Sequence, residues 1–383
     1  MTVLHHRVPP GQVRDAIVKY LKYRAKPMLV TEIEAGVCSE LGCRISPSSV
    51  RSYLALNTPG LFERRERGQY SLACEPQLTQ RDSIAFSEFA YGKATLYKGD
   101  CLQWLAQQKS SSLHAVLTDP PYGLVEYSKP EQRKLREGRG GVWRIPPSFD
   151  GHKRSPLPRF TVLDADDLSR LREFFGRWAR VLLPVLVPGA NVVVASNPLL
   201  SHLVSMELSN AGFERRGELV RLVMTMRGGD RPKNAHTEFS GVTVMPRSMW
   251  EPWLVFRKPL EGRVQDNLRR WRTGGFRRPS LQRPFGDVIA SSPTHKRERT
   301  LAPHPSLKPQ AFLRQVARAM LPLGDGVVLD PFAGSGSTLA ACEHVGYQSV
   351  GVECDSAYFN LAKQGIPHLA RLEIHDGSLY SQD

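Results

Sequence analysis

A carboxylate, two prolines and an aromatic ring follow one another at Asp119-Pro120-Pro121-Tyr122. Because proline fixes the backbone and has no N–H, this loop should present the Asp119 carboxylate and the Pro120 carbonyl as two fixed hydrogen-bond acceptors. Two acceptors beside an aromatic ring suit a planar group that carries an amino donor. The alternative for these four residues alone is an ordinary proline-rich turn after a strand.

A glycine-rich segment, DPFAGSGST at 330–338, is the second place where chemistry is expected. Such a turn into a helix lets a ligand approach the backbone closely. The segment lacks the lysine of a P-loop, and Leu339 replaces the third glycine of the dinucleotide-binding fingerprint. Glu353 follows Gly334 by about twenty residues, a place where an acidic residue commonly binds ribose hydroxyls. The pattern therefore predicts a nucleoside-containing ligand without a run of phosphates.

Both motifs come directly after short apolar runs that are rich in β-branched residues. Four such runs alternate with helical patterns, at residues 115–118, 191–196, 326–330 and 349–353. This alternation is typical of buried parallel strands in an α/β sheet. Ligands of such sheets bind at the carboxyl ends of the strands, which is where both motifs lie.

Together the motifs resemble those of the S-adenosylmethionine-dependent amino DNA methyltransferases, in which DPPY is the catalytic motif and FAGSGS the cofactor motif. With DPPY first, the order is similar to that of the beta group. The segments LYKGDC at 96–101 and HPSLKP at 304–309 match two further family segments. The resemblance covers about residues 93–372. It implies an α/β, Rossmann-like methyltransferase fold with a mixed, mostly parallel seven-stranded sheet.

The resemblance also implies roles for individual residues. The catalytic residues would be Asp119, Pro120, Pro121 and Tyr122, with the tyrosine stacking on a base that is flipped out of the duplex. Lys308 would lie near the carboxylate of the cofactor, and Glu353 would lie at its ribose. The residues expected to bind S-adenosylmethionine are Asp100, Cys101, His304, Lys308, Asp330, Phe332, Ala333, Gly334, Ser335, Gly336 and Glu353. No metal is expected.

The prediction of the target base rests on the first residue of the catalytic motif. In the family, Asp before PPY favours N6 of adenine, and N4 of cytosine is the alternative. Carbon-5 methylation of cytosine is disfavoured because the sequence contains no Pro-Cys pair. Two other functions stay open, namely a DNA-binding regulator with a vestigial methyltransferase fold and an RNA methyltransferase.

The net charge of +15 favours a polyanionic partner such as nucleic acid. Nearly all of the excess falls in two irregular stretches, 129–159 and 257–299. We therefore expect a basic loop over 124–160 and a target recognition region over 257–303. Two tryptophans within 249–253 are assigned to the core rather than to a platform for bases. The arginines expected to contact DNA in the recognition region are Arg269, Arg270, Arg272, Arg277 and Arg278.

Residues 10–73 show three helical patterns followed by an alternating hairpin, which resembles a winged helix-turn-helix domain. Arg51 would lie on its recognition helix, and Arg64 and Arg65 on its wing. A winged helix that binds another protein is the alternative. The expected organisation is a winged-helix-like domain at 1–75, a linker at 76–92 and a methyltransferase domain at 93–375.

Composition excludes several other classes. With 41% hydrophobic and 23% charged residues, the chain is neither disordered nor fibrous. No apolar run reaches the ~18 residues of a membrane helix, and the six cysteines form no CxxC pair. We expect a cytoplasmic, nucleoid-associated protein whose partner is double-stranded DNA. By analogy with the family, a cognate restriction or defence system and a second copy of the chain are further expected partners.

Overall fold

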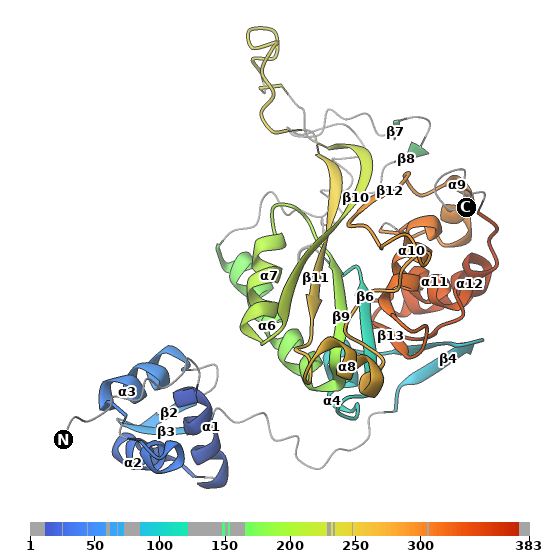
Figure 1. Ribbon diagram of the computed structural model, residues 1–383. Coiled ribbons are helices and arrows are strands. Elements are labelled where there is room, and N and C mark those ends of the chain that lie inside the picture. Colours follow the sequence, from blue (N-terminus) through green and yellow to red (C-terminus); the bar gives the residue numbers. More distant parts are fainter. Residues whose placement is uncertain are drawn as a thin grey trace. The chain divides into compact units, whose positions relative to one another are not determined.

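A computed structural model gives the fold of the chain (Figure 1). Tyr122 and nearly all of the expected basic loop lie outside the residues that the structure describes. The chain forms two compact units, 1–84 and 85–383. The described residues are 12–24, 26–43, 45–58, 62–66, 68–72, 85–121, 148–149, 152–153, 165–227, 231–232, 234–246, 248–304 and 306–374.

The N-terminal unit consists of three helices and a small antiparallel sheet. Helix α3 begins at Pro47, directly after Ser46, as the Ser-Pro pair predicts. Buried Ile17, Ile33 and Phe62 join the helices to the sheet. Its elements are α1 (Gln12–Arg24), β1 (Met28–Leu29), α2 (Val30–Leu41), α3 (Pro47–Leu56), β2 (Phe62–Glu66) and β3 (Gln69–Leu72). These are the elements that a winged helix requires, and its assignment as a DNA-binding domain stays a prediction.

The second unit is built on a mixed sheet with the order β12-β10-β11-β9-β6-β13-β14-β5-β4. Neighbours pair in parallel except at β10–β11, β11–β9 and β4–β5. The mixed, mostly parallel sheet is confirmed. Its strands are β4 (Ser87–Tyr91), β5 (Ala94–Lys98), β6 (Leu113–Thr118), β9 (Leu186–Ala195), β10 (Glu214–Arg227), β11 (Ser248–Arg257), β12 (Val288–Ala290), β13 (Val327–Asp330) and β14 (Gln348–Glu353). A separate two-stranded sheet joins β7 (Ser148–Phe149) to β8 (His152–Lys153).

The expectation of seven strands is wrong, because nine strands of the described chain belong to this sheet. Strand β4 pairs with β5 and lies inside the segment 76–92, which was expected to be a linker. Strand β12 pairs with β10 and lies inside 257–303, which was expected to be a recognition region. Both are edge strands; β4 (SEFAY) has no continuous apolar run, and the run of β12 (VIA) is only three residues long.

Helices cover both faces of the sheet, as Figure 1 shows for α6 and α7 on one side and α10, α11 and α12 on the other. Alternate residues of β9 belong to two different hydrophobic cores. Val192 belongs to the same core as Trp178, and Val193 belongs to the same core as Phe312. The helices are α4 (Cys101–Ala106), α6 (Ala165–Val185), α7 (Ser201–Asn210), α8 (Val264–Trp271), α9 (Lys296–Leu301), α10 (Gln310–Met320), α11 (Ser337–His344) and α12 (Ser356–Ala370). Within the described ranges, every helix is too short or too polar to cross a membrane.

Candidate active site

The two motifs predicted from sequence meet at one edge of the sheet. Strands β6, β13, β14 and β5 are parallel neighbours, so their carboxyl ends lie side by side. At this edge Thr118 Oγ1 donates to Asp330 Oδ1 over 2.6 Å, and the Gly99 amide donates to the Glu353 carbonyl over 2.9 Å. We call it the carboxyl edge. The prediction that both motifs share it is confirmed by the strand order.

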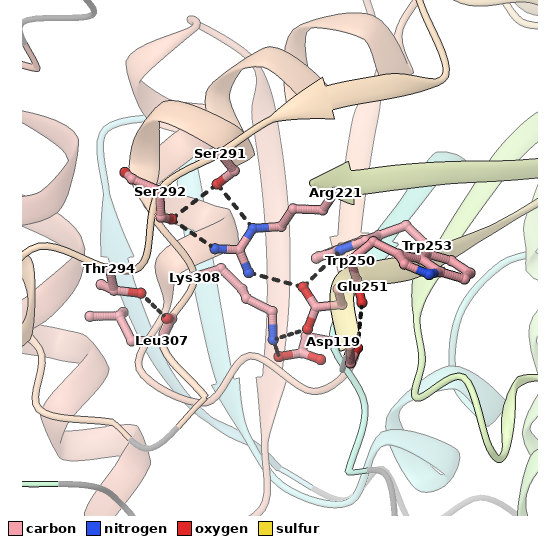
Figure 2. A network of polar contacts seen from close by, with 11 residues as sticks. Asp119, Arg221, Trp250, Glu251, Trp253, Ser291, Ser292, Thr294, Leu307 and Lys308 are labelled. Atoms are coloured by element: carbon pink, nitrogen blue, oxygen red, sulfur yellow. Dashed lines mark hydrogen bonds and ion pairs between the residues drawn. The ribbon is translucent and has the colours of Figure 1, made fainter. Parts of the chain in front are cut away.

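Asp119 follows the last residue of β6, and its carboxylate is fixed by an ion pair. Lys308 Nζ lies 2.5 Å from Asp119 Oδ2 (Figure 2). Pro120 is buried and Pro121 is exposed, so the loop turns outward immediately after the acceptor pair. The Lys308 ammonium therefore contacts the catalytic loop, and its place near the carboxylate of the cofactor stays a prediction.

Lys308 is buried among other charged groups. Its Nζ also lies 3.2 Å from Glu251 Oε1, and Glu251 Oε2 accepts from Arg221 Nη1 over 3.0 Å. Burial lowers the pKa of Lys308, but the carboxylates of Asp119 and Glu251 outweigh burial and raise it above 10.5. Burial likewise raises the pKa of Glu251, and Lys308 and Arg221 reverse this and hold it at about 2. Lys308 and Glu251 are therefore both charged at neutral pH.

The glycine-rich turn between β13 and α11 is shaped to expose its backbone. Gly334 and Gly336 have φ angles of 52° and 78°, the left-handed region that glycine adopts without strain. A Cβ on Gly336 would lie 2.4 Å from Ile366 Cγ1. The Ala333 amide donates to the Val352 carbonyl over 3.0 Å, which holds the turn against the end of β14. The turn fits the close approach of a cofactor to its backbone.

Glu353 lies beside this turn, as the spacing predicts. Its Oε2 accepts from the Gly334 amide over 2.8 Å, and its Oε1 accepts from the Asp355 amide over 2.7 Å. Burial raises the pKa of this carboxyl, an effect that the two amides partly offset. A carboxylate held at the end of β14 next to the turn is placed to accept hydrogen bonds from ribose hydroxyls.

Asp330 and Ser335 lie beneath the turn rather than on its surface. Asp330 is 3% exposed, and its Oδ1 accepts from Thr118 Oγ1 and from the Phe332 amide over 3.2 Å. Burial raises the pKa of this carboxyl to about 6. Ser335 is buried as well. Both side chains support the turn from inside the protein, and the role of these residues in binding the cofactor stays a prediction.

Residues distant in sequence complete the surroundings of the turn. The His304 ring lies 3.2 Å from where a Cβ of Gly334 would be, and burial together with Lys308 lowers its pKa to about 4, so it is neutral. The Phe332 ring packs on Trp178 at 5.7 Å between centroids. Asp100 caps α4 by accepting from the Gln103 amide.

Cys101 is buried at the start of α4, directly after Asp100. Burial raises the pKa of its thiol to about 12, so the thiol is protonated at neutral pH. A protonated, buried thiol is a poor nucleophile. Its place near the end of β14 allows a packing contact with a ligand at the carboxyl edge.

The five arginines of 257–303 that were predicted to contact DNA lie at the other end of the strands. Asn267 of α8 donates to the Pro188 carbonyl near the start of β9, and Arg272 pairs with Asp325, just before β13 begins. That these five arginines contact DNA stays a prediction. Each has a polar contact there, namely Arg269 with Asp266, Arg270 with Glu261, Arg272 with Asp325, Arg277 with Tyr347 and Arg278 with the Leu281 carbonyl.

The arginines predicted on the N-terminal unit lie where sequence placed them within that unit. Arg51 is on α3 and pairs with Glu34, and Arg64 and Arg65 are exposed on β2. Among the described residues near the carboxyl edge, Lys296 and Arg297 of α9 are exposed and basic, shortly before His304.

Sequence reasoning also missed Glu251 and Arg221. Both are buried or half-buried charged residues on paired strands, since Arg221 of β10 lies opposite Glu251 of β11. The available signal was a carboxylate between two tryptophans in an otherwise apolar strand. Of those tryptophans, Trp253 is fully buried as predicted, whereas Trp250 is 37% exposed and does not fit the core assignment.

The α/β/α layers, the acceptor pair after β6 and the glycine-rich turn after β13 define a methyltransferase of the α/β class. A family model described as DNA methylase, N6_N4_Mtase, matches residues 113–364. The chain belongs to this family of N6-adenine and N4-cytosine DNA methyltransferases. S-adenosylmethionine is the cofactor that this membership supports, and the open turn with Glu353 beside it fits a nucleoside-containing ligand.

Individual relatives are distant but similar along most of their length. The chain is 23% identical over 293 residues to the Type II methyltransferase M.HindIII of Haemophilus influenzae, covering 70% of this chain and 93% of that one. It is 22% identical to M2.DpnII of Streptococcus pneumoniae, covering 71% and 89%. Among solved structures, PvuII DNA methyltransferase (cytosine-N4-specific) matches with a TM-score of 0.47 at 15% identity, covering 74% of this chain and 87% of that one.

Proposed function

We propose that the protein transfers a methyl group from S-adenosylmethionine to N6 of adenine in duplex DNA. The observation that carries the proposal is the acceptor pair of Asp119 and Pro120 at the end of β6. Strand β13, whose end carries the glycine-rich turn, is the next strand in the sheet. An amino group held by the first motif would therefore face a ligand held by the second.

The acceptor pair addresses the weak nucleophilicity of an exocyclic amine. The lone pair of that nitrogen is delocalised into the base. Hydrogen bonds from the amine to the Asp119 carboxylate and the Pro120 carbonyl favour a tetrahedral nitrogen, whose lone pair points at the methyl group. Bound S-adenosylmethionine supplies that methyl group on a sulfonium. Alignment of the two reacting atoms then contributes most of the acceleration.

We propose that the target base leaves the duplex. The Asp119 side chain is only 14% exposed, which disfavours contact with a base that is still stacked and paired. We propose that a flipped base enters over Pro121, with Tyr122 stacking on it at ~1–3 kcal/mol. No covalent intermediate on the enzyme is needed, in keeping with the protonated thiol of Cys101.

The choice of adenine rests on Asp as the first residue of the catalytic motif. To test it, duplex DNA is incubated with the protein and S-adenosylmethionine, digested to nucleosides and analysed by mass spectrometry. We expect N6-methyldeoxyadenosine with the wild type and none with Asp119→Asn. N4-methyldeoxycytidine would establish the alternative base, and no methylated nucleoside from the wild type would refute the proposal.

We further propose that the N-terminal unit binds DNA through Arg51, Arg64 and Arg65. Replacing Arg64 and Arg65 by Ala in the full chain should weaken DNA binding and leave the affinity for S-adenosylmethionine unchanged. Unchanged DNA affinity would favour a protein-binding role for this unit. A restriction or defence partner, a homodimer and association with the nucleoid stay predictions.

A further inference from the structure

Four charged side chains of alternating sign form a chain that leads into the active site. Asp119 contacts Lys308 over 2.5 Å, Lys308 contacts Glu251 over 3.2 Å, and Glu251 contacts Arg221 over 3.0 Å (Figure 2). The side chains of Lys308 and Arg221 are 9% and 7% exposed. Charges taken out of water to this extent need close partners, and here each has at least one.

Further contacts hold Arg221 and Glu251, the two charged side chains farthest from the catalytic loop. Arg221 Nε donates to Ser291 Oγ and its Nη2 donates to the Ser292 carbonyl, both over 3.1 Å. Its guanidinium carbon also lies 5.3 Å from the centre of the Phe312 ring. Glu251 Oε2 accepts from Trp253 Nε1 over 3.2 Å in addition to Arg221. Glu251 is thus held on one oxygen and presents the other to Lys308.

We propose that Glu251 is a positioning residue for methyl transfer, which acts by holding the Lys308 ammonium against Oδ2 of Asp119 and by balancing its charge. This inference rests on the proposed function. Through Lys308, Glu251 fixes the position of Oδ2 of Asp119. The orientation of the catalytic carboxylate is therefore set from β11, on the far side of Lys308.

The charge of Glu251 matters because the amine becomes cationic as it accepts the methyl group. A lone ammonium beside Asp119 would cancel the carboxylate and oppose that developing positive charge. With Glu251 present, Lys308 is shared between two carboxylates, and Asp119 keeps its attraction for the amine. The same arrangement keeps Lys308 protonated, because Asp119 and Glu251 favour its charge, while burial and Arg221 disfavour it. His304, whose pKa Lys308 lowers, is neutral and adds no charge.

Glu251→Gln tests the proposal because it keeps the shape of the side chain and removes its charge. We expect the single-turnover rate of methyl transfer at neutral pH to fall at least about tenfold, or ~1.4 kcal/mol in barrier height. Without Glu251 the pKa of Lys308 falls, so the loss of activity at alkaline pH should begin at a lower pH than in the wild type. Affinity for S-adenosylmethionine should be unchanged.

Two further variants separate charge from packing. Glu251→Asp keeps the charge but withdraws it from Lys308, so both the rate and the pH at which activity is lost on the alkaline side should lie between those of the wild type and those of Glu251→Gln. Glu214→Gln breaks a different β10–β11 ion pair, to Arg257, where β10 begins and β11 ends, and should behave as the wild type. If Glu251→Gln does not fold, Glu251→Asp decides alone, and a wild-type rate with it overturns the proposal.

The outcomes separate this inference from the function on which it rests. A wild type that methylates no DNA refutes the proposed function before any variant is compared. If the wild type is active, an unchanged rate in Glu251→Gln overturns the inference. A reduced rate with the alkaline limit of the wild type also overturns it, because the residue would then act on folding and not through Lys308.

Discussion

Replacing Asp330 by Asn should change the pH dependence of stability. In the structure, this buried carboxyl accepts from Thr118 Oγ1 and from the Phe332 amide, and burial raises its pKa from 3.8 to about 6. A group with a raised pKa contributes stability that is fully present below pH 3.8 and is lost as pH rises through about 6. Asn keeps the accepting oxygen and has no charge to bury.

The size of the effect follows from the pKa shift. At about 1.4 kcal/mol per pKa unit, the shift costs the folded wild type ~3 kcal/mol once the carboxyl is fully ionised. Roughly 1.4 kcal/mol of this develops between pH 5 and pH 8. Relative to Asp330→Asn, the wild type should therefore lose about that much free energy of unfolding over this interval.

Urea unfolding of both proteins at pH 5 and pH 8, followed by tryptophan fluorescence, measures this difference. Every other titrating group is common to the two proteins, so its contribution cancels in the comparison. If the free energies of unfolding of the two proteins change in parallel between pH 5 and pH 8, Asp330 does not titrate near pH 6. Such parallel changes would also show that its burial under the turn costs less than the structure indicates.

Three further predictions concern the cofactor, the thiol and DNA. Gly336→Ala should abolish binding of S-adenosylmethionine in a calorimetric titration, because its methyl would lie 2.4 Å from Ile366 Cγ1 at a φ of 78°; wild-type affinity would remove the turn from the site. Cys101→Ala should transfer methyl groups at the wild-type rate, and an inactive but folded variant would contradict a mechanism without a thiol. Neutralising a basic pair at the carboxyl edge should weaken DNA binding and reduce its salt dependence, with a slope lower by about 1 per phosphate contact, whereas a pair at the opposite edge should have no effect. The pair at the carboxyl edge is Lys296 with Arg297, and the pair at the opposite edge is Arg269 with Arg270. If both double substitutions weaken DNA binding equally when it is titrated against salt, this placement of DNA is contradicted.

Much of the fold could be predicted because it depends on local patterns. The apolar runs at 115–118 and 349–353 are central strands, since a strand buried on both faces must be apolar throughout. The edge strand β4, with the sequence SEFAY, carries no such run and escaped prediction. The meeting of the two motifs at one edge followed from the rule that parallel strands end on the same side.

The contacts that adjust the site could not be predicted, because they join distant parts of the chain. Lys308 and Asp119 are separated by 189 residues, and only the pairing of β10 with β11 brings Glu251 to the same place. The position of the arginines near Arg270 in the fold could not be predicted for a similar reason. The sequence shows their charge, but it does not show on which edge of the sheet α8 packs.

The four charged side chains that begin with Asp119 also bear on the register in which β10 and β11 pair. In the observed register, Arg221 lies opposite Glu251, and Glu251 reaches Lys308. A slip of two residues would keep the same apolar side chains facing the core, so hydrophobic patterning alone does not exclude it. It would, however, separate Glu251 from Arg221 or Lys308 and leave a buried charge without its partner, at a cost of ~3–5 kcal/mol. The ion pairs that orient the catalytic carboxylate therefore also select the strand register that creates them.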